Sequence, residues 1–239
     1  MDKALLEIIE NFDNVGTDFA VGNRNKIKVV PYNNILLNIK SFKVPNFLNG
    51  IVYKFFRDSK AKRSFKFAKI LEEKQIGTPK PIAYYENFTW YRLNESYYIS
   101  EHLKPDYVFR DVFYENLTDL DSILIQLGHF CFNLHEKGIE FLDHSPGNTL
   151  IKKNLDGVYD FFLVDLNRMK FHKKMSFKKR MKNLSRLTPS EYHIKFISKG
   201  YAKNYEKSEE EVFELLWEFT KKFQSKYLKK QSLKKKIKL

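Results

Sequence analysis

Two hydrophobic patterns divide the chain. Between Phe19 and Glu101 the apolar and aromatic positions mostly form short runs rich in β-branched residues, which is typical of strands. The strand candidates are residues 26–30, 35–42, 82–86 and 97–101. The segment Lys60–Glu73 has apolar residues at helical spacing instead, and the GTPKP sequence after it requires extended chain. The first half is therefore predicted to be β-rich with one main helix.

After Leu103 the spacing becomes helical. Residues 118–137 place one apolar face along a long helix, and Gly138 suits its C-terminal cap. The SEEE sequence at Ser208–Glu211 has the form of a capping box, and an apolar stripe follows it. The predicted fold class is α+β, with a small antiparallel β-rich lobe over residues 1–102 and a mostly helical lobe over residues 103–239 that ends in a basic helical tail.

Composition supports a packed, soluble protein. Apolar residues make up 43% of the 239 residues and aromatic residues 16%, enough for a sizeable core. The single Cys131 excludes an internal disulfide framework and favours a reducing compartment. Acidic residues interrupt the apolar positions of the N-terminal stretch, and nowhere do about 18 apolar residues run together. We therefore expect a cytoplasmic protein.

The net charge of +14 is concentrated in two segments. Residues 168–186 and residues 221–238 hold nine Lys or Arg each and no acidic residue, which leaves 25 basic residues against 29 acidic ones elsewhere. The two runs are either solvated helical faces or surfaces for an anionic partner such as nucleic acid, a membrane or a phosphorylated glycolipid.

The sequence EFLDHSPGNTLI carries the candidate chemistry. Asp143 and Asn148 lie five positions apart around a Pro-Gly pair that favours a fixed loop. Asp165 follows at the end of the apolar sequence FFLVD. In phosphoryl transfer, one Asp orients the attacking hydroxyl, an Asn five residues later holds a metal ion, and an Asp after a strand holds Mg²⁺ against the ATP phosphates. Mg²⁺ prefers oxygen ligands, so one carboxylate, one amide oxygen and phosphates form a suitable set.

These features resemble known kinases. LHEKGIEFLDHSPGNTLI is similar to the helix end and catalytic loop of the two-lobed protein kinase-like fold, although Phe141 stands where that fold usually has His. VGNRNKIKVV, NIKSFKVPN, SKAKRS with GTPKP, and VDLNRM resemble the lipopolysaccharide kinase family over roughly residues 15–175. That family phosphorylates Kdo or heptose in the inner core of lipopolysaccharide.

The resemblance implies a role for each matching residue. Asp143 would be the catalytic base toward the sugar hydroxyl, and Asn148 and Asp165 would be the metal ligands, with ATP and Mg²⁺ as cofactors. Lys40 would contact the α and β phosphates of ATP, and Lys54 is its rival because it too lies in an apolar run.

Further nucleotide contacts are expected from the backbone. Gly22, Asn23 and Arg24 would form the turn over the phosphates, unless this segment is a simple hairpin turn. The main chain of Glu101 and Leu103 would meet the adenine between the lobes, so residues 1–102 would be the nucleotide-binding lobe and residues 103–239 the catalytic lobe. No D-F-G sequence and no clear activation segment is present.

The leading hypothesis is an ATP-dependent kinase of the lipopolysaccharide inner core, with Kdo as the favoured sugar and heptose as the other candidate. It predicts a Kdo-lipid A type acceptor, a monomer that binds peripherally to the anionic inner face of the cytoplasmic membrane, and no nucleic acid partner. Two alternatives remain at this point. One is a kinase of the same fold for another small-molecule or protein hydroxyl, and the other is a non-enzymatic basic module that binds lipid or nucleic acid.

Overall fold

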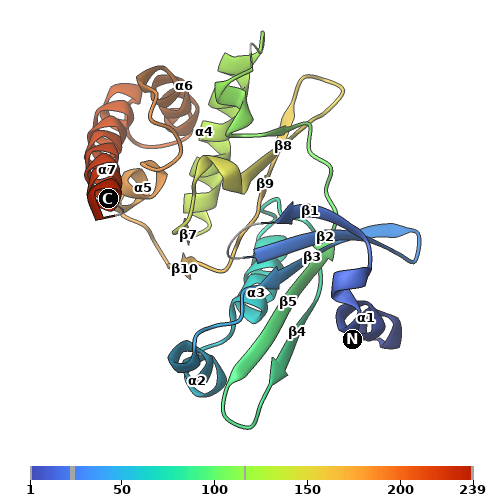
Figure 1. Cartoon of the computed structure of the whole chain (residues 1–239). Coiled ribbons are helices and arrows are strands. Elements are labelled where there is room, and N and C mark those ends of the chain that lie inside the picture. The colour runs from blue at the N-terminus through green and yellow to red at the C-terminus, as the bar shows by residue number, and fades with distance from the viewer. Residues whose placement is uncertain (1, 22–24, 116, 238–239) are drawn as a thin grey trace. The chain divides into compact units, whose positions relative to one another are not determined.

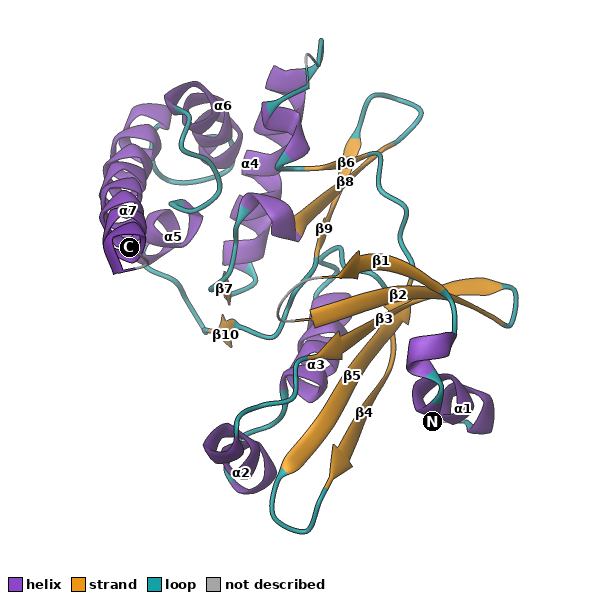
Figure 2. Ribbon diagram, viewed as in Figure 1, coloured by secondary structure: helices purple, strands orange, loops and turns teal. Residues whose placement is uncertain are grey.

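The computed structural model describes residues 2–21, 25–115 and 117–237, which form two compact units. Unit 1 comprises residues 1–104 and 165–168, and unit 2 comprises residues 105–164 and 169–239. Figure 1 shows the course of the chain, and Figure 2 shows that strands dominate unit 1 and helices dominate unit 2. The predicted Gly22, Asn23 and Arg24 turn lies outside the described residues.

Unit 1 is built on a five-stranded antiparallel sheet with the strand order β1-β2-β3-β5-β4. Its elements are α1 (Lys3–Glu10), η1 (Phe12–Asn14), β1 (Thr17–Val21), β2 (Asn25–Tyr32), β3 (Ile35–Phe42), α2 (Phe47–Phe55), α3 (Lys60–Glu73), β4 (Pro81–Phe88) and β5 (Leu93–Glu101). The predicted strand at 35–42 and helix at 60–73 match β3 and α3. The helices α1 and α2 were not predicted.

Helices cover both faces of this sheet. Leu5 and Ile9 of α1 pack with Leu37 and Ile39 of β3 in one buried cluster. On the opposite face, Phe65 of α3 contacts Tyr84 of β4, with ring centroids 5.4 Å apart. Because side chains alternate along a strand, Lys40 points away from the α1 cluster and lies on the α3 face.

Unit 2 combines a helical core with short strands. Its elements are β6 (Tyr107–Val108), η2 (Asp111–Phe113), α4 (Leu120–Glu136), β7 (Ile139–Phe141), η3 (Pro146–Asn148), β8 (Thr149–Lys153), β9 (Tyr159–Leu163), β10 (Met169–Phe171), α5 (Phe177–Leu184), α6 (Glu191–Ala202) and α7 (Glu209–Ile237). On α4, Leu124, Leu127, Cys131 and Leu134 are fully buried, as the apolar face predicted. Gly138 ends this region with a φ of +73°, which few other residues tolerate.

Two glycines allow α4 and α6 to cross at very short distance. A Cβ atom on Gly128 would lie 2.1 Å from the carbonyl oxygen of Ile197, and one on Gly200 would lie 1.8 Å from that of Ile125. Since both obstacles are backbone atoms, no side-chain rotation could relieve the overlap. The contact between the two helices therefore depends on the two missing side chains.

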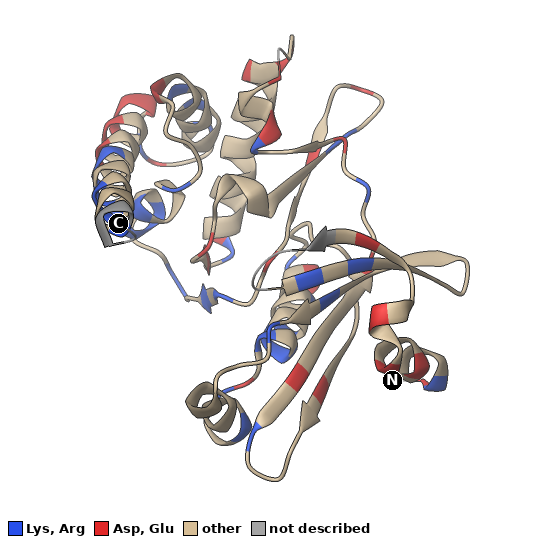
Figure 3. Ribbon diagram, in the orientation of Figure 1, with Lys and Arg blue, Asp and Glu red and all other residues tan. Residues whose placement is uncertain are grey.

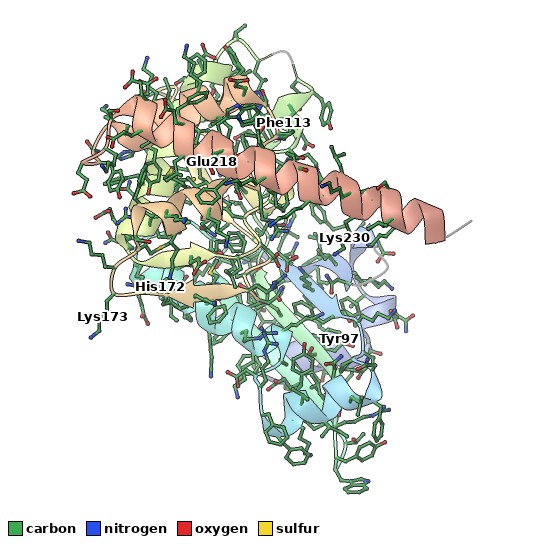
Figure 4. All side chains as sticks on the ribbon, turned by 90° about the vertical axis from the view of Figure 1, so that its left-hand side faces the viewer. Tyr97, Phe113, His172, Lys173, Glu218 and Lys230 are labelled. Atoms are coloured by element: carbon green, nitrogen blue, oxygen red, sulfur yellow. The ribbon has the colours of Figure 1, made fainter. Side chains whose placement is uncertain are left out.

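The long α7 begins with the predicted capping box. Ser208 N–H donates to Glu211 Oε2 at 3.0 Å, and Glu211 N–H donates to Ser208 Oγ at 3.2 Å. Acidic residues occupy the start of the helix and basic residues its later part, as Figure 3 shows; Figure 4 labels Glu218 and, nearer the C-terminal end, Lys230. Side chains 225–234 are all exposed. Among the helices that the structure describes, none is long and apolar enough to cross a membrane.

Candidate active site

The loop after β7 is closed by local hydrogen bonds that explain the spacing of Asp143 and Asn148. Asn148 Nδ2 donates to the carbonyl oxygen of Asp143 at 2.8 Å, and Ser145 N–H donates to the same oxygen at 2.7 Å. The amide nitrogen of Asn148 is thus directed at the loop, which leaves Oδ1 as the atom that could bind a cation. The carbonyl of Asn148 in turn accepts the N–H of Val164, the residue before Asp165 in the chain.

Arg186 holds this loop from the other side. Its Nη1 lies 2.7 Å from the carbonyl oxygen of Leu142 and 3.2 Å from Oδ1 of Asp143, so one nitrogen contacts both the backbone and the carboxylate. The guanidinium also lies over the ring of Phe223 in α7, 5.4 Å from the centroid. Arg186 therefore fixes the carboxylate of Asp143. The sequence indicated it only as the last member of a basic run.

A buried network on α5 supports the residue two positions before Asp143. Asn183 Nδ2 donates to the carbonyl oxygen of Phe141 at 2.8 Å, and Asn183 Oδ1 lies 3.1 Å from Nε2 of His135. Because Oδ1 can only accept, Nε2 carries the proton, and Nδ1 accepts from the hydroxyl of Tyr201 at 2.9 Å. Burial lowers the pKa of His135 to about 3, so the ring is neutral near pH 7.

His144 follows Asp143 and is fully buried. Its ring packs against Phe141 with centroids 5.4 Å apart, and neither ring nitrogen has a hydrogen-bond partner among the described residues. Burial lowers its pKa to about 3. His144 is therefore a packing residue beneath the loop and has no surface to offer a substrate.

In unit 1, Lys40 and Asp165 form an ion pair. Lys40 lies on the central strand β3, opposite Tyr98 of β5, and its Nζ is 2.8 Å from Oδ1 of Asp165. The apolar sequence FFLVD is a strand only in its first three residues, because β9 stops at Leu163 and Asp165 lies in the loop beyond it. Glu72 of α3 is another carboxylate in unit 1, but it pairs with Lys69 at 2.9 Å. The carboxylate partner of Lys40 in this structure is Asp165.

The backbone at Asp165 is strained. Its φ of +59° is uncommon for a residue with a side chain, and such positions cost about 1–3 kcal/mol. The conformation is held by the buried side chain of Leu166 and by Asn167, whose Nδ2 donates to Oδ1 of Asp165 at 2.7 Å. Strain of this kind persists only where surrounding contacts maintain it. Such positions cluster at functional sites.

The other nucleotide candidates have varied surroundings. Lys54 lies on the helix α2, not on a strand, and its Nζ donates to the carbonyl oxygen of Thr89 at 2.6 Å. At the end of β5, the N–H of Glu101 donates to the carbonyl oxygen of Lys80 at 2.9 Å, and Leu103 follows in the connecting loop. The roles of Lys40, Glu101 and Leu103 in binding nucleotide stay predictions.

The residues present suit a hard cation that keeps ligands of its own. Within the described ranges, no three His, Cys, Asp or Glu side chains form a cluster that could hold a metal ion. An amide oxygen, as on Asn148, and a carboxylate, as on Asp165, are the ligand types that Mg²⁺ accepts when phosphates and water complete its shell, and the joint binding of one ion by these two residues stays a prediction.

The fold has a clear counterpart among solved structures. A structure described as "WaaP in complex with acyl carrier protein" matches 92% of this chain and 92% of that chain, with a TM-score of 0.62 and 14% sequence identity. At this identity the likeness concerns the fold, which is the α+β protein kinase-like fold predicted from the sequence.

The family follows from the sequence itself. Residues 47–207, about two thirds of the chain, match the lipopolysaccharide kinase (Kdo/WaaP) family, and the chain belongs to that family. A comparison with curated protein sequences gave no match. The predicted family is thereby confirmed, and the protein is a lipopolysaccharide kinase.

Proposed function

We propose that the protein transfers the γ-phosphate of ATP to a sugar hydroxyl of the lipopolysaccharide inner core, with Kdo as the favoured acceptor and heptose as the other candidate. The observation that carries this proposal is the closed loop of Asp143 and Asn148, held by Arg186, in a member of the lipopolysaccharide kinase family.

Asp143 acts as the base in this proposal. Its carboxylate accepts the proton of the attacking hydroxyl, and Arg186 keeps that carboxylate oriented through the 3.2 Å contact. The hydrogen bonds that the side chains of Asn148 and Arg186 donate to main-chain carbonyl oxygens restrain the loop before substrate binds. Little reorganisation is therefore required during the reaction.

Mg²⁺ would be held by Asn148 and Asp165, and when bound it neutralises charge on the transferred phosphate. Lys40 would contact the α and β phosphates, which requires its ammonium group to exchange part of its contact with Asp165 for phosphate oxygens. The left-handed backbone at Asp165 supports a functional role for this residue, since strained positions of this kind cluster at functional sites.

The proposed location is the inner face of the cytoplasmic membrane. The basic residues of α5 and of the later part of α7 (Figure 3) would attract anionic lipid, and each nearby Lys or Arg contributes roughly 1 kcal/mol. An acyl carrier protein is a further candidate partner, because the related WaaP structure contains one. Co-purification of this chain with an acyl carrier protein would test that idea.

The central experiment measures phosphate transfer from ATP to purified inner-core acceptors, with the products identified by mass spectrometry. Asp143→Asn should abolish transfer and keep ATP binding, whereas Asp165→Asn should weaken Mg-ATP binding as well. Asp156→Asn is the matched control, because Asp156 is exposed in the turn between β8 and β9. Wild-type turnover by folded Asp143→Asn protein, or no transfer to any core sugar by the wild type, would refute the proposal.

A further inference from the structure

A cavity of about 430 Å³ in unit 2 lies beside the catalytic loop. Leu142, which precedes Asp143, lines it, and so does Arg186, whose guanidinium contacts Asp143. Its volume falls in the range of small-molecule sites and exceeds the needs of a simple ion. A group bound there would therefore be close to the carboxylate that we assign as the base.

The lining of the cavity is strongly basic. Lys178, Lys179 and Lys182 of α5 line it together with Arg186, and none of the three lysines forms an ion pair among the described residues. The acidic side chain in the lining is Glu140, which pairs with Nε2 of His172 at 2.7 Å. Glu218 of α7 attracts Lys178 electrostatically but is not paired with it, so in the part of the chain that the structure describes these lysines have no carboxylate at salt-bridge distance.

The charge arrangement of α5, the helix that carries these lysines, destabilises the helix when it is considered alone. Lys178 and Lys182 are one turn apart, and like charges at this spacing destabilise a helix. Lys178 and Lys179 also lie in the first turn, where the helix dipole disfavours cations and where α5 has no acidic residue. The N-cap residue Ser176 lines the cavity and makes no side-chain capping bond. An anion in the cavity would relieve each of these costs.

We propose that this cavity binds the acidic group, a carboxylate or a phosphate, of the acceptor sugar. The proposal rests on the proposed kinase function and adds the subsite that recognises the acceptor. Lys178, Lys179 and Lys182 contact the anionic group together with the uncapped N–H groups of α5. Fixing the anion at this position holds the sugar so that a neighbouring hydroxyl reaches Asp143.

The test compares two soluble acceptors, the methyl glycoside of Kdo and the same glycoside with its carboxyl group reduced to an alcohol. The variant is Lys178→Gln with Lys182→Gln. The matched control is Lys195→Gln with Lys199→Gln, because these lysines are also exposed and one turn apart, on α6. We expect the first variant to raise KM for the acidic glycoside by about tenfold or more, as loss of charged hydrogen bonds typically does. The control should leave it unchanged, and the wild type should use the reduced glycoside poorly.

Additional arms separate the sources of the anion. If inorganic phosphate competes with the acceptor, and competes less in the Lys178→Gln/Lys182→Gln variant, the cavity is a phosphate site. If phosphate does not compete while loss of the carboxylate has a strong effect on KM, the cavity is a carboxylate site. An equal change in KM for both glycosides would overturn the proposal. So would an effect seen only with acceptor embedded in anionic vesicles, because the lysines would then serve membrane attachment.

Direct binding keeps this inference separate from the proposed function. If the wild type phosphorylates neither glycoside, Kdo as the favoured acceptor is rejected, and the cavity is then tested by titrating the acidic glycoside into wild type and variant and following the protein by NMR. Weaker binding to the variant than to the control would uphold an anion-recognising cavity. Equal binding to all three proteins would reject it.

Discussion

Mild acid should destabilise unit 2, because two buried histidines resist protonation in the native state. Burial lowers the pKa of both His135 and His144 to about 3, whereas in an unfolded chain both titrate near 6.5. Above about pH 6.5 both states are neutral and stability is complete. As the pH falls from 6.5 toward 3, the unfolded state binds protons that the native state does not, and stability is lost.

The expected size of the effect is large. Each histidine costs about 1.4 kcal/mol per pH unit in this window, so the pair costs about 4 kcal/mol at about pH 5. That loss is a substantial part of the free energy of unfolding of a typical domain, which is about 5–15 kcal/mol. The half-buried His193, whose pKa burial also lowers, adds to the loss in the same direction. Carboxylates titrate mostly below about pH 5, so they contribute little to the slope between about pH 7 and 5.

The assay is urea unfolding at about pH 7, 6 and 5, read from a probe in unit 2 alone. The chain has two tryptophans, so Trp90→Phe leaves Trp217 of α7 as the reporter, and Trp90 is 85% exposed and tolerant of change. His144→Leu should reduce the slope by about half, since its ring nitrogens have no described partner to lose. A free energy of unfolding that is constant from about pH 7 to 5, or a slope that His144→Leu leaves unchanged, would contradict the reasoning.

Three further predictions concern the nucleotide site, the helix crossing and the tail. Lys40→Met should lower kcat by on the order of a hundredfold in the ATP transfer assay, whereas Lys54→Met should be mild because that lysine contacts the carbonyl of Thr89; the reverse order would reject the placement of the phosphates. Gly128→Ala should lower the free energy of unfolding by about 3 kcal/mol despite the better helix propensity of Ala, and Gly157→Ala, where a Cβ meets nothing within 4 Å, should cost only about 1 kcal/mol from its positive φ; equal losses in urea unfolding would count against the close crossing. Truncation after Ser225 should weaken sedimentation with anionic vesicles at low salt more than it weakens turnover on a soluble acceptor, and equal binding to neutral vesicles would contradict a membrane role.

An apolar buried side made several elements predictable from the sequence, although α1, which buries Leu5 and Ile9, was not predicted. β3 and α3 match because alternation and helical spacing are visible when core residues are hydrophobic, and the box at Ser208 is visible because capping depends on local residue types. The helix α2 escaped prediction for a physical reason. Phe47, Leu48 and Phe55 are exposed, so its apolar residues mark no buried face.

The support of the candidate site escaped prediction because it is polar. The buried side of α5 includes Arg180 and Asn183, which belong to a hydrogen-bonded network and have no apolar period. Their run of basic neighbours suggested only surface charge. The spacing of Asp143 and Asn148 was visible, but the contact of Arg186 with Asp143 joins residues 43 positions apart that no local pattern connects.

The four residues Asp165–Arg168 have a consequence for any attempt to dissect the protein. They belong to unit 1, although the chain on both sides of them belongs to unit 2. A fragment ending at residue 104 would retain Lys40 and lose Asp165, its ion-pair partner, whereas the complementary fragment would carry that carboxylate without the sheet it joins. The two units are therefore interwoven along the chain and are not separable modules. Exchange of the N-terminal unit between related kinases would succeed only if this short segment were exchanged with it.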